Sequence, residues 1–305
     1  MKEFYSHGKL LLSGEYLVLD GALALALPTQ PGQWLRVRDS ESPGLTWKSL
    51  LPYGTPWFET HFPQGTFEGN RAEGPFPSPA RERLRYFLLK CRELNPDFTD
   101  ILHNLEVETS LEFPRQWGLG SSSTLVANLA EWAGVDPYVL LGETMGGSGY
   151  DIAAARSERP IFFRRIQGVP TAVEIPFDPP FANELFFVFQ NTKQDSREGI
   201  ARYRTRHFDL PAAEKRISEL TFTLATAPDL ETFSHALDEH EAVIGAILGI
   251  KPIRERLFPD YPGSLKSLGA WGGDFILATG DVSNQDYFRK KGYTVIKTYK
   301  DLILA

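Results

Sequence analysis

A strand, a glycine-serine turn and a helix follow one another between residues 105 and 133, and no other part of the sequence constrains the fold as much. Apolar side chains alternate over residues 105–113, which predicts a strand with one buried face. The turn that follows reads Gly118-Leu119-Gly120-Ser121-Ser122-Ser123. Apolar side chains at helical spacing over residues 125–133 then predict a helix that ends at Gly134.

A turn of this kind can bind phosphate groups. Glycines let the backbone approach a phosphate closely, and the N–H groups at the start of a helix attract an anion. The same residues also fit a simpler interpretation, a loop closed by a serine N-cap. The lysine of the Walker pattern and the third glycine of the dinucleotide-binding pattern are both absent, so neither of those nucleotide-binding folds is indicated.

Composition excludes several classes of function. The chain has 305 residues, 42% of them hydrophobic and 23% charged, which is enough for two globular domains. With a formal net charge of -7 and no basic stripe, the chain is a poor candidate for binding nucleic acid or an anionic membrane. No apolar run approaches the roughly 20 residues of a membrane span, and residues 10–12 are too few for a signal peptide. We expect a soluble, cytoplasmic protein, with the single cysteine, Cys91, as a buried thiol.

The first half of the chain is rich in strand patterns. Short runs predict strands over residues 22–27, ended by Pro28, over 34–38 and over 57–62. Residues 63–79 are rich in Gly and Pro and are expected to form an exposed loop before a helix over 80–94. Asp136-Pro137 predicts the capped start of another helix.

The second half alternates long helices with short strands. Prolines at positions 170, 176, 179 and 180 mark a connection, so we place a domain boundary there, between residues 1–170 and 171–305. Strands are expected over 185–189, 275–278 and 293–297, helices over 212–226 and 230–248, and a second glycine-containing loop over 266–273.

Three charged residues near these turns are candidates for chemistry. Asp151 stands at the start of a predicted helix, where an acid either pairs with the helix dipole or serves as a catalytic base beside the glycine-rich turn. Lys9 lies in an apolar, strand-like stretch and is either a snorkelling lysine or a functional one. Glu15, after Gly14, leaves the same two alternatives open.

Four segments resemble, in the right order, the motifs of the GHMP kinases, a family that includes galactokinase and the homoserine, mevalonate and phosphomevalonate kinases. These segments cover residues 8–21, 114–123, 149–153 and 266–274. The first contains Gly14-Glu15-Tyr16, the third is Gly149-Tyr150-Asp151-Ile152-Ala153, and the last contains Gly272-Gly273-Asp274. The sequence is most similar to a bacterial subgroup marked by Gly-Tyr-Asp-Ile-Ala.

The resemblance implies an α+β protein with the GHMP kinase fold. Its N-terminal domain would be a ribosomal-protein-S5-domain-2-like α/β domain that binds ATP, and its C-terminal domain would be ferredoxin-like. ATP would lie in the cleft between the two domains.

The resemblance also implies residue roles. Asp151 would accept the proton of the substrate hydroxyl, and Lys9 would pair with Asp151 and help neutralise the transferring phosphate. Gly118, Leu119, Gly120, Ser121, Ser122 and Ser123 would wrap the phosphates of ATP, and Ser122 would bind Mg²⁺. Glu143 is the candidate for the family's magnesium-binding glutamate, although that residue usually lies further before the aspartate. Positioning and charge neutralisation dominate phosphoryl transfer, so few side chains need to act.

Two tryptophans depart from the family pattern. Trp271 replaces a residue that is usually glycine in the last motif, and Trp117 stands where a small residue is common. The two indoles either line the ligand cleft or pack in the core.

The acceptor is indicated by a few residues only. Gly14-Glu15-Tyr16 and Gly272-Gly273-Asp274 are most similar to phosphomevalonate kinases, so Glu15, Tyr16, Gly272 and Gly273 are candidate substrate residues. Lys193 and Arg197 either hold a substrate phosphate or carboxylate or belong to a solvated loop before a helix.

The resemblance therefore predicts a magnesium-ATP kinase that acts on a small acid as a monomer or homodimer. Mevalonate and phosphomevalonate are the acceptors to test first. Alternatives are a homoserine kinase or another GHMP substrate, and a nucleotide-binding protein without catalysis. Retention of both Lys9 and Asp151 argues against the last of these, because a pure binding protein does not need that pair.

Overall fold

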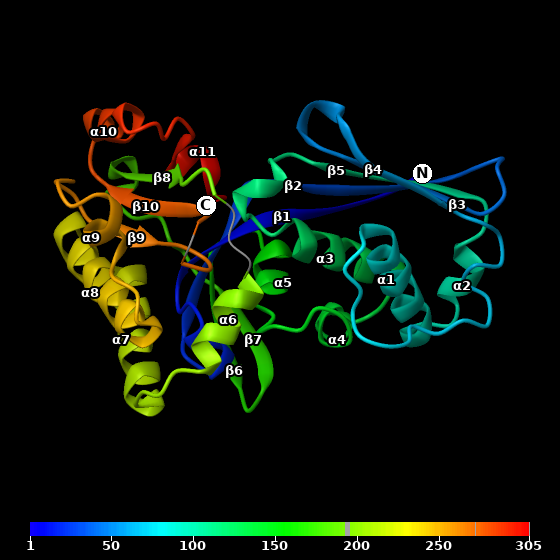
Figure 1. Ribbon diagram of the computed structural model, residues 1–305, viewed down its shortest axis with the longest axis horizontal. Coiled ribbons are helices and arrows are strands. Elements are labelled where there is room, and N and C mark those ends of the chain that lie inside the picture. Colours follow the sequence, from blue (N-terminus) through cyan, green and yellow to red (C-terminus); the bar gives the residue numbers. More distant parts are fainter. Residues whose placement is uncertain (193–195, 272, 305) are drawn as a thin grey trace. The chain divides into compact units, whose positions relative to one another are not determined.

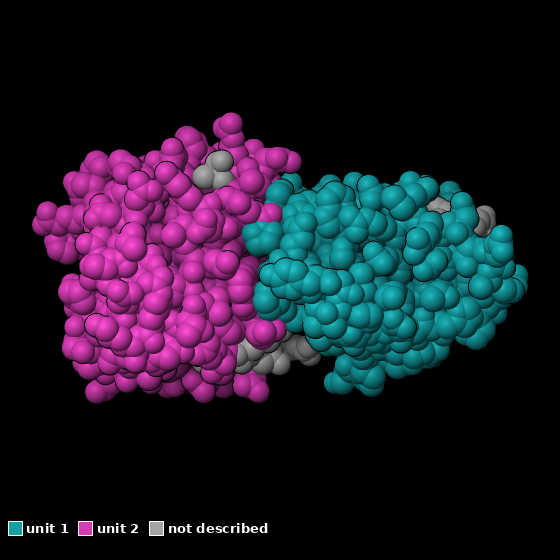
Figure 2. All heavy atoms as spheres, turned by 90° about the horizontal axis from the view of Figure 1, so that it is seen from above, with its two compact units in different colours: residues 1–8, 31–115, 120–156 teal, residues 9–30, 116–119, 157–305 magenta. Residues whose placement is uncertain are grey.

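The structure is a computed structural model that describes residues 1–192, 196–271 and 273–304. Lys193 and Gly272 lie outside the described residues, as does the side chain of Arg197. The chain forms two compact units, each assembled from separate stretches of sequence. Unit 1 comprises residues 1–8, 31–115 and 120–156, and unit 2 comprises residues 9–30, 116–119 and 157–305 (Figure 2). These units are defined by spatial contacts, and the sequence division at residue 170 stays a prediction.

Unit 1 packs helices against one face of a sheet (Figure 1). Its strands are β3 (Leu45–Leu50), β4 (Pro56–Phe62), β5 (Leu105–Leu111) and the second part of β2 (Ala24–Asp39), and β1 (Lys2–Ser13) begins in it. β5 pairs antiparallel with β2 and parallel with β3, which also pairs with β4. Its helices are α1 (Ala80–Leu94), α2 (Phe98–Ile101), α3 (Ser121–Ala133), α4 (Pro137–Gly142) and α5 (Tyr150–Ala155).

The core of unit 1 follows from the predicted periodicities. The buried face of β5 includes Leu105 and Val107, and it packs with Leu88 of α1 and Val126 and Leu129 of α3. Asp136 caps α4 as expected, because its side chain accepts hydrogen bonds from the N–H groups of Tyr138 and Val139. Cys91 is buried, as predicted.

Unit 2 contains a second, antiparallel sheet with the strand order β11-β8-β10-β9. Its strands are β8 (Leu185–Phe189), β9 (Leu265–Ser267), β10 (Phe275–Thr279) and β11 (Ile296–Thr298). Two long helices, α7 (Leu210–Thr226) and α8 (Leu230–Leu248), lie side by side next to this sheet (Figure 1). The shorter elements are β6 (Ile161–Ile166), β7 (Val169–Glu174), α6 (Ser196–Arg204), α9 (Ile253–Leu257), α10 (Gln285–Lys290) and α11 (Tyr299–Leu302).

One strand expectation is wrong. Pro28 does not end the strand that begins near residue 22, because β2 continues from Ala24 to Asp39. Residues Ala24 to Ala26 of β2 pair with β6, and Gln33 to Asp39 pair with β5. Pro28 and Pro31 stand between these two paired stretches, where a missing N–H does not interrupt either ladder.

Candidate functional site

The first half of the glycine-serine turn is docked within unit 2. Gly118 has φ +70, and a side chain there would clash with the carboxylate of Asp274. The Leu119 carbonyl accepts a hydrogen bond from the backbone N–H of Lys9 at 2.9 Å. Trp117 packs edge-on against Phe275, with ring centroids 5.6 Å apart. Segments of the first, second and last motifs therefore contact one another directly.

The second half of the turn starts helix α3 in unit 1. Gly120, with φ +87, is the N-cap, and no side chain caps the helix. The hydroxyl of Ser123 donates back to the Gly120 carbonyl at 2.9 Å, and Ser122 is exposed. The serine N-cap interpretation is therefore wrong. The first-turn N–H groups of a 13-residue helix remain available to an anion, which fits a bound phosphate.

The predicted base and its predicted partner belong to different units. Asp151 lies half-buried in the first turn of α5, behind Gly149 with φ +96. Lys9 lies half-buried on β1 in unit 2. Their roles and their pairing stay predictions.

The magnesium candidates differ in their surroundings. Glu143, at the end of α4, lies 3.4 Å from the Nζ of Lys90, and its side chain is 54% exposed. Among the described residues, no group of three or more His, Cys, Asp or Glu side chains could hold a metal ion. Mg²⁺ in phosphoryl-transfer proteins is commonly bound by one or two carboxylates together with substrate phosphates. A serine or threonine hydroxyl supplies a ligand in P-loop proteins, and the exposed Ser122 offers such a hydroxyl.

The turn after β1 is strained and closely packed. Gly14 has φ +92, and a Cβ there would lie 2.7 Å from the Cβ of Ala24. Tyr16 has φ +62, a conformation that costs a non-glycine residue about 1–3 kcal/mol. The Tyr16 hydroxyl donates to the Ala270 carbonyl at 2.9 Å, and its ring stacks on Tyr203 of α6 with centroids 5.6 Å apart. Strain of this kind persists only where the surrounding structure fixes it.

Buried charged groups surround this turn. Lys266 forms an ion pair with Glu15, and both side chains are at most 1% exposed. The N–H of Gly14 donates to Nε2 of His240 at 3.1 Å, and the same nitrogen lies 3.5 Å from Glu15. Glu241 accepts hydrogen bonds from the N–H of Ile253 and from the N–H and hydroxyl of Ser267. We call Glu15, His240, Glu241 and Lys266 the buried charge cluster.

Burial sets the protonation states in the cluster. Burial raises the pKa of Glu15 to about 7, although Lys266 acts in the opposite direction. Burial, reinforced by the positive charge of Lys266, holds the pKa of His240 well below its usual range. Burial also raises the pKa of Glu241. His240 is therefore a neutral imidazole whose Nε2 accepts the Gly14 hydrogen bond.

The last motif is folded tightly against this cluster. Trp271 has φ +60 and is 2% exposed, and its ring would be 3.5 Å from a Cβ added at Gly245 of α8. Trp271 therefore packs in the core. The buried Gly273 accepts a hydrogen bond from the side chain of Gln190 at 2.9 Å. Trp117 is only partly buried, and the Nζ of Lys297 lies 5.4 Å from its ring centroid.

Within unit 2 the structure brings several of the predicted residues into contact. Within unit 2, Lys9 contacts Leu119, and Tyr16 contacts the last motif. Glu15 is in the interior, so any effect of its side chain on substrate binding would act through neighbouring residues. Its part in substrate binding stays a prediction. Sequence reasoning missed His240 and Glu241. A signal existed, because both fall on the apolar face of α8 between Phe233 and Ile244, where an ionisable side chain needs a partner.

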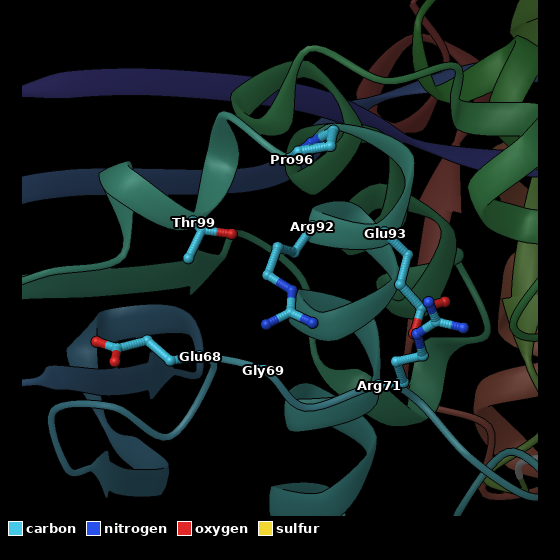
Figure 3. A pocket seen from close by; sticks show the side chains of 7 residues that line it. All are labelled: Glu68, Gly69, Arg71, Arg92, Glu93, Pro96 and Thr99. Atoms are coloured by element: carbon cyan, nitrogen blue, oxygen red, sulfur yellow. The ribbon is translucent and has the colours of Figure 1, made fainter.

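A groove of about 730 Å³ lies on unit 1 (Figure 3). None of its described lining residues belongs to the four motifs. Glu68, Gly69 and Arg71 come from the segment after β4, Arg92 and Glu93 from α1, and Pro96 and Thr99 from the segment around α2. This segment is attached to α1, since the N–H of Ala72 donates to Glu93 at 2.7 Å and Arg92 contacts the Asn70 carbonyl.

No helix in the described part of the chain is long and apolar enough to cross a membrane.

Known structures share this fold at low sequence identity. Mevalonate kinase of Methanococcus jannaschii is 13% identical, with a TM-score of 0.72, and the match covers 97% of this chain and 98% of that one. Streptococcus pneumoniae phosphomevalonate kinase, in complex with phosphomevalonate and AMPPNP, is 15% identical, with a TM-score of 0.70 and coverage of 98% and 100%. Lactococcus lactis galactokinase, complexed with galactose, is 14% identical, with a TM-score of 0.66 and coverage of 97% and 92%.

No protein-family profile and no curated protein sequence matches the chain. The structural matches nevertheless extend over nearly its whole length. The chain has the α+β fold of the GHMP kinases, and the fold predicted from the four motifs is confirmed.

Proposed function

We propose that this protein is an ATP-dependent kinase that transfers the γ-phosphoryl group to a hydroxyl or phosphate of a small acid. The observation that carries the proposal is the second motif within the GHMP kinase fold, which leads into a helix start without a side-chain cap. A helix start of this kind attracts phosphate through its N–H groups and its dipole.

We assign the steps of the reaction to residues on the basis of the motifs. Asp151 would accept the proton of the acceptor hydroxyl, and Lys9 would balance negative charge beside the transferring group. The backbone of residues 118–123 would hold the ATP phosphates, and Ser122 would supply a ligand to Mg²⁺. Magnesium, when bound, would neutralise charge on the phosphate oxygens. We propose Glu143 as the weaker metal candidate, because Lys90 already lies beside it.

Mevalonate or phosphomevalonate is the proposed acceptor, which would place the reaction in isoprenoid precursor synthesis. Support comes from the similarity of the first and last motifs to phosphomevalonate kinases and from neighbours crystallised with R-mevalonate and with phosphomevalonate. Tyr16 and Gly273, with Lys193, Arg197 and Gly272, stay candidates for acceptor binding. We further propose two domains, residues 1–170 and 171–305, and a monomer or homodimer that works in the cytoplasm.

Other acceptors are supported by the same fold. The galactose complex of a galactokinase neighbour shows that the fold also accommodates a sugar, so homoserine and galactose belong in any test. A nucleotide-binding protein without catalysis is the alternative from another class.

ADP release from magnesium-ATP by the purified protein tests the proposal. Mevalonate, phosphomevalonate, homoserine and galactose are each offered as acceptor, to wild type and to Asp151→Asn. We expect turnover with mevalonate or phosphomevalonate, and its loss in Asp151→Asn with ATP binding retained. Tight ATP binding without turnover on any acceptor would favour the non-catalytic alternative. Equal turnover in both proteins would contradict the role of Asp151.

A further inference from the structure

The turn over residues 14–16 is held by three separate contacts inside unit 2. His240 accepts a hydrogen bond from the N–H of Gly14, and Lys266 forms an ion pair with Glu15. The Ala270 carbonyl accepts a hydrogen bond from the hydroxyl of Tyr16. Two of the three contacts come from the segment 266–270, which opens the last motif. The first and last motifs are therefore tied together by side chains from the interior.

These contacts coincide with backbone strain. Tyr16, Trp271 and Asp274 all have positive φ, and they belong to the first and last motifs. Such conformations gather at functional sites and persist only where their surroundings over-determine them. The buried charge cluster supplies that constraint, because a charge in the interior requires its partner at one fixed place.

The cluster is also costly in a way that packing alone does not explain. Glu15 Oε2 and His240 Nδ1 are buried without a hydrogen-bond partner among the described residues. Apolar side chains of similar volume commonly stabilise a core at least as well as a buried ion pair. The geometry therefore points to a role in placing the turn.

We propose that Lys266 and His240 are positioning residues that hold the strained turn of residues 14–16, and with it the strand that carries Lys9, in the geometry for phosphoryl transfer. The inference rests on the proposed kinase function. Both side chains are fully buried, and they act through the backbone of Gly14 and the side chain of Glu15. A displacement of about 1 Å at the reacting groups can cost about a hundredfold in rate, so loosening this turn lowers kcat.

The test separates positioning from stability. The double variant Glu15→Gln with Lys266→Met leaves no buried charge unpaired between these two positions, so its Tm should stay close to that of wild type. We expect its kcat to fall about tenfold to a hundredfold, and amide exchange over residues 14–19 to accelerate about tenfold or more. Thr109→Val is the control, because it removes a buried hydrogen bond to Ser49 in unit 1. It should lower Tm and leave kcat and this exchange unchanged.

A second pair of variants applies if the double variant does not fold. His240→Gln retains an acceptor for the Gly14 N–H, whereas His240→Leu does not. We expect kcat and slow exchange at residues 14–19 to be largely retained by Gln and lost by Leu. The inference would be overturned if the double variant or His240→Leu kept the kcat and the amide exchange rates of wild type. It would also be overturned if the loss of kcat in every variant were proportional to the loss of Tm. A wild type without turnover would instead overturn the proposed function, and the exchange measurements would still decide whether the cluster holds the turn.

Discussion

The two compact units bury different kinds of polar side chain. Around α3 in unit 1, neutral buried side chains are hydrogen-bonded to one another and to the backbone, as in the contacts of Asn128 with the Ser6 hydroxyl and the Gln33 carbonyl. Unit 2 holds Glu15, His240, Glu241 and Lys266, the four buried Asp, Glu, His, Lys or Arg side chains of the described chain. Neutral networks fix packing at modest cost, whereas buried charges fix one arrangement at high cost. The difference indicates that unit 2 requires a precisely placed turn and unit 1 a well-packed core.

The largest effect is expected from Lys266→Met alone. The variant leaves Glu15 buried without its ion-pair partner, and such a loss typically costs about 3–5 kcal/mol. Denaturant unfolding of wild type and variant measures the difference. If the variant is as stable as wild type, the charge of Lys266 is not needed inside unit 2 and the contrast between the units collapses.

Asn128→Ala tests the neutral network of unit 1. It removes the acceptor for the hydroxyl of Ser6 and the donor to the Gln33 carbonyl, which should cost about 1–3 kcal/mol. Because no charge is involved, the loss measured by denaturant unfolding should be the same at pH 5.5 and pH 8. A loss that depends on pH would show that the two networks do not differ as described.

The pH dependence of stability should differ in sign between two variants of the cluster. The pKa of His240 is lowered by folding, so its contribution is present above pH 6.5 and is lost as pH falls below it. The pKa of Glu15 is raised to about 7, so its contribution is greatest below its unfolded value of 4.5 and declines as pH rises toward 7. Glu241 and Lys266 face both groups and are common to both variants.

Unfolding free energies between pH 5 and 7 measure these slopes against wild type. Relative to wild type, Glu15→Gln, which retains His240, should lose stability with acidification, by up to about 1.4 kcal/mol per pH unit. His240→Leu, which retains Glu15, should gain stability with acidification by a similar amount at most. Parallel curves for the two variants and wild type would show that neither group titrates differently on folding.

The smallest effect is expected from an exposed charge in the same unit. Arg216 of α7 bonds to Glu239 of α8 at 2.6 Å, with both side chains close to half exposed. Arg216→Ala should cost less than about 1 kcal/mol, and the loss should shrink as salt is raised. A loss as large as that of Lys266→Met would mean that charge, rather than its burial, explains the contrast.

The sequence predicts those parts of this site that depend on local pattern. Alternating apolar residues predict strand β5, and the glycines predict the turn with Gly118 and Gly120. Helical spacing of apolar residues predicts α3. The continuation of β2 past Pro28 was not, because it depends on which strands pair on either side of the proline. Glu15 was recognised, but its burial was not, since its partners His240 and Lys266 lie more than 200 residues away along the chain.

Identification of the phosphorylated product by phosphorus-31 NMR tests the central claim most directly. Wild type, magnesium-ATP and phosphomevalonate or mevalonate are incubated together, beside Asp151→Asn that has been shown to bind ATP. The account predicts loss of the γ-phosphate resonance of ATP and a new phosphoryl resonance on one acceptor with wild type only. Failure of the folded wild-type protein to bind ATP at all would contradict the account.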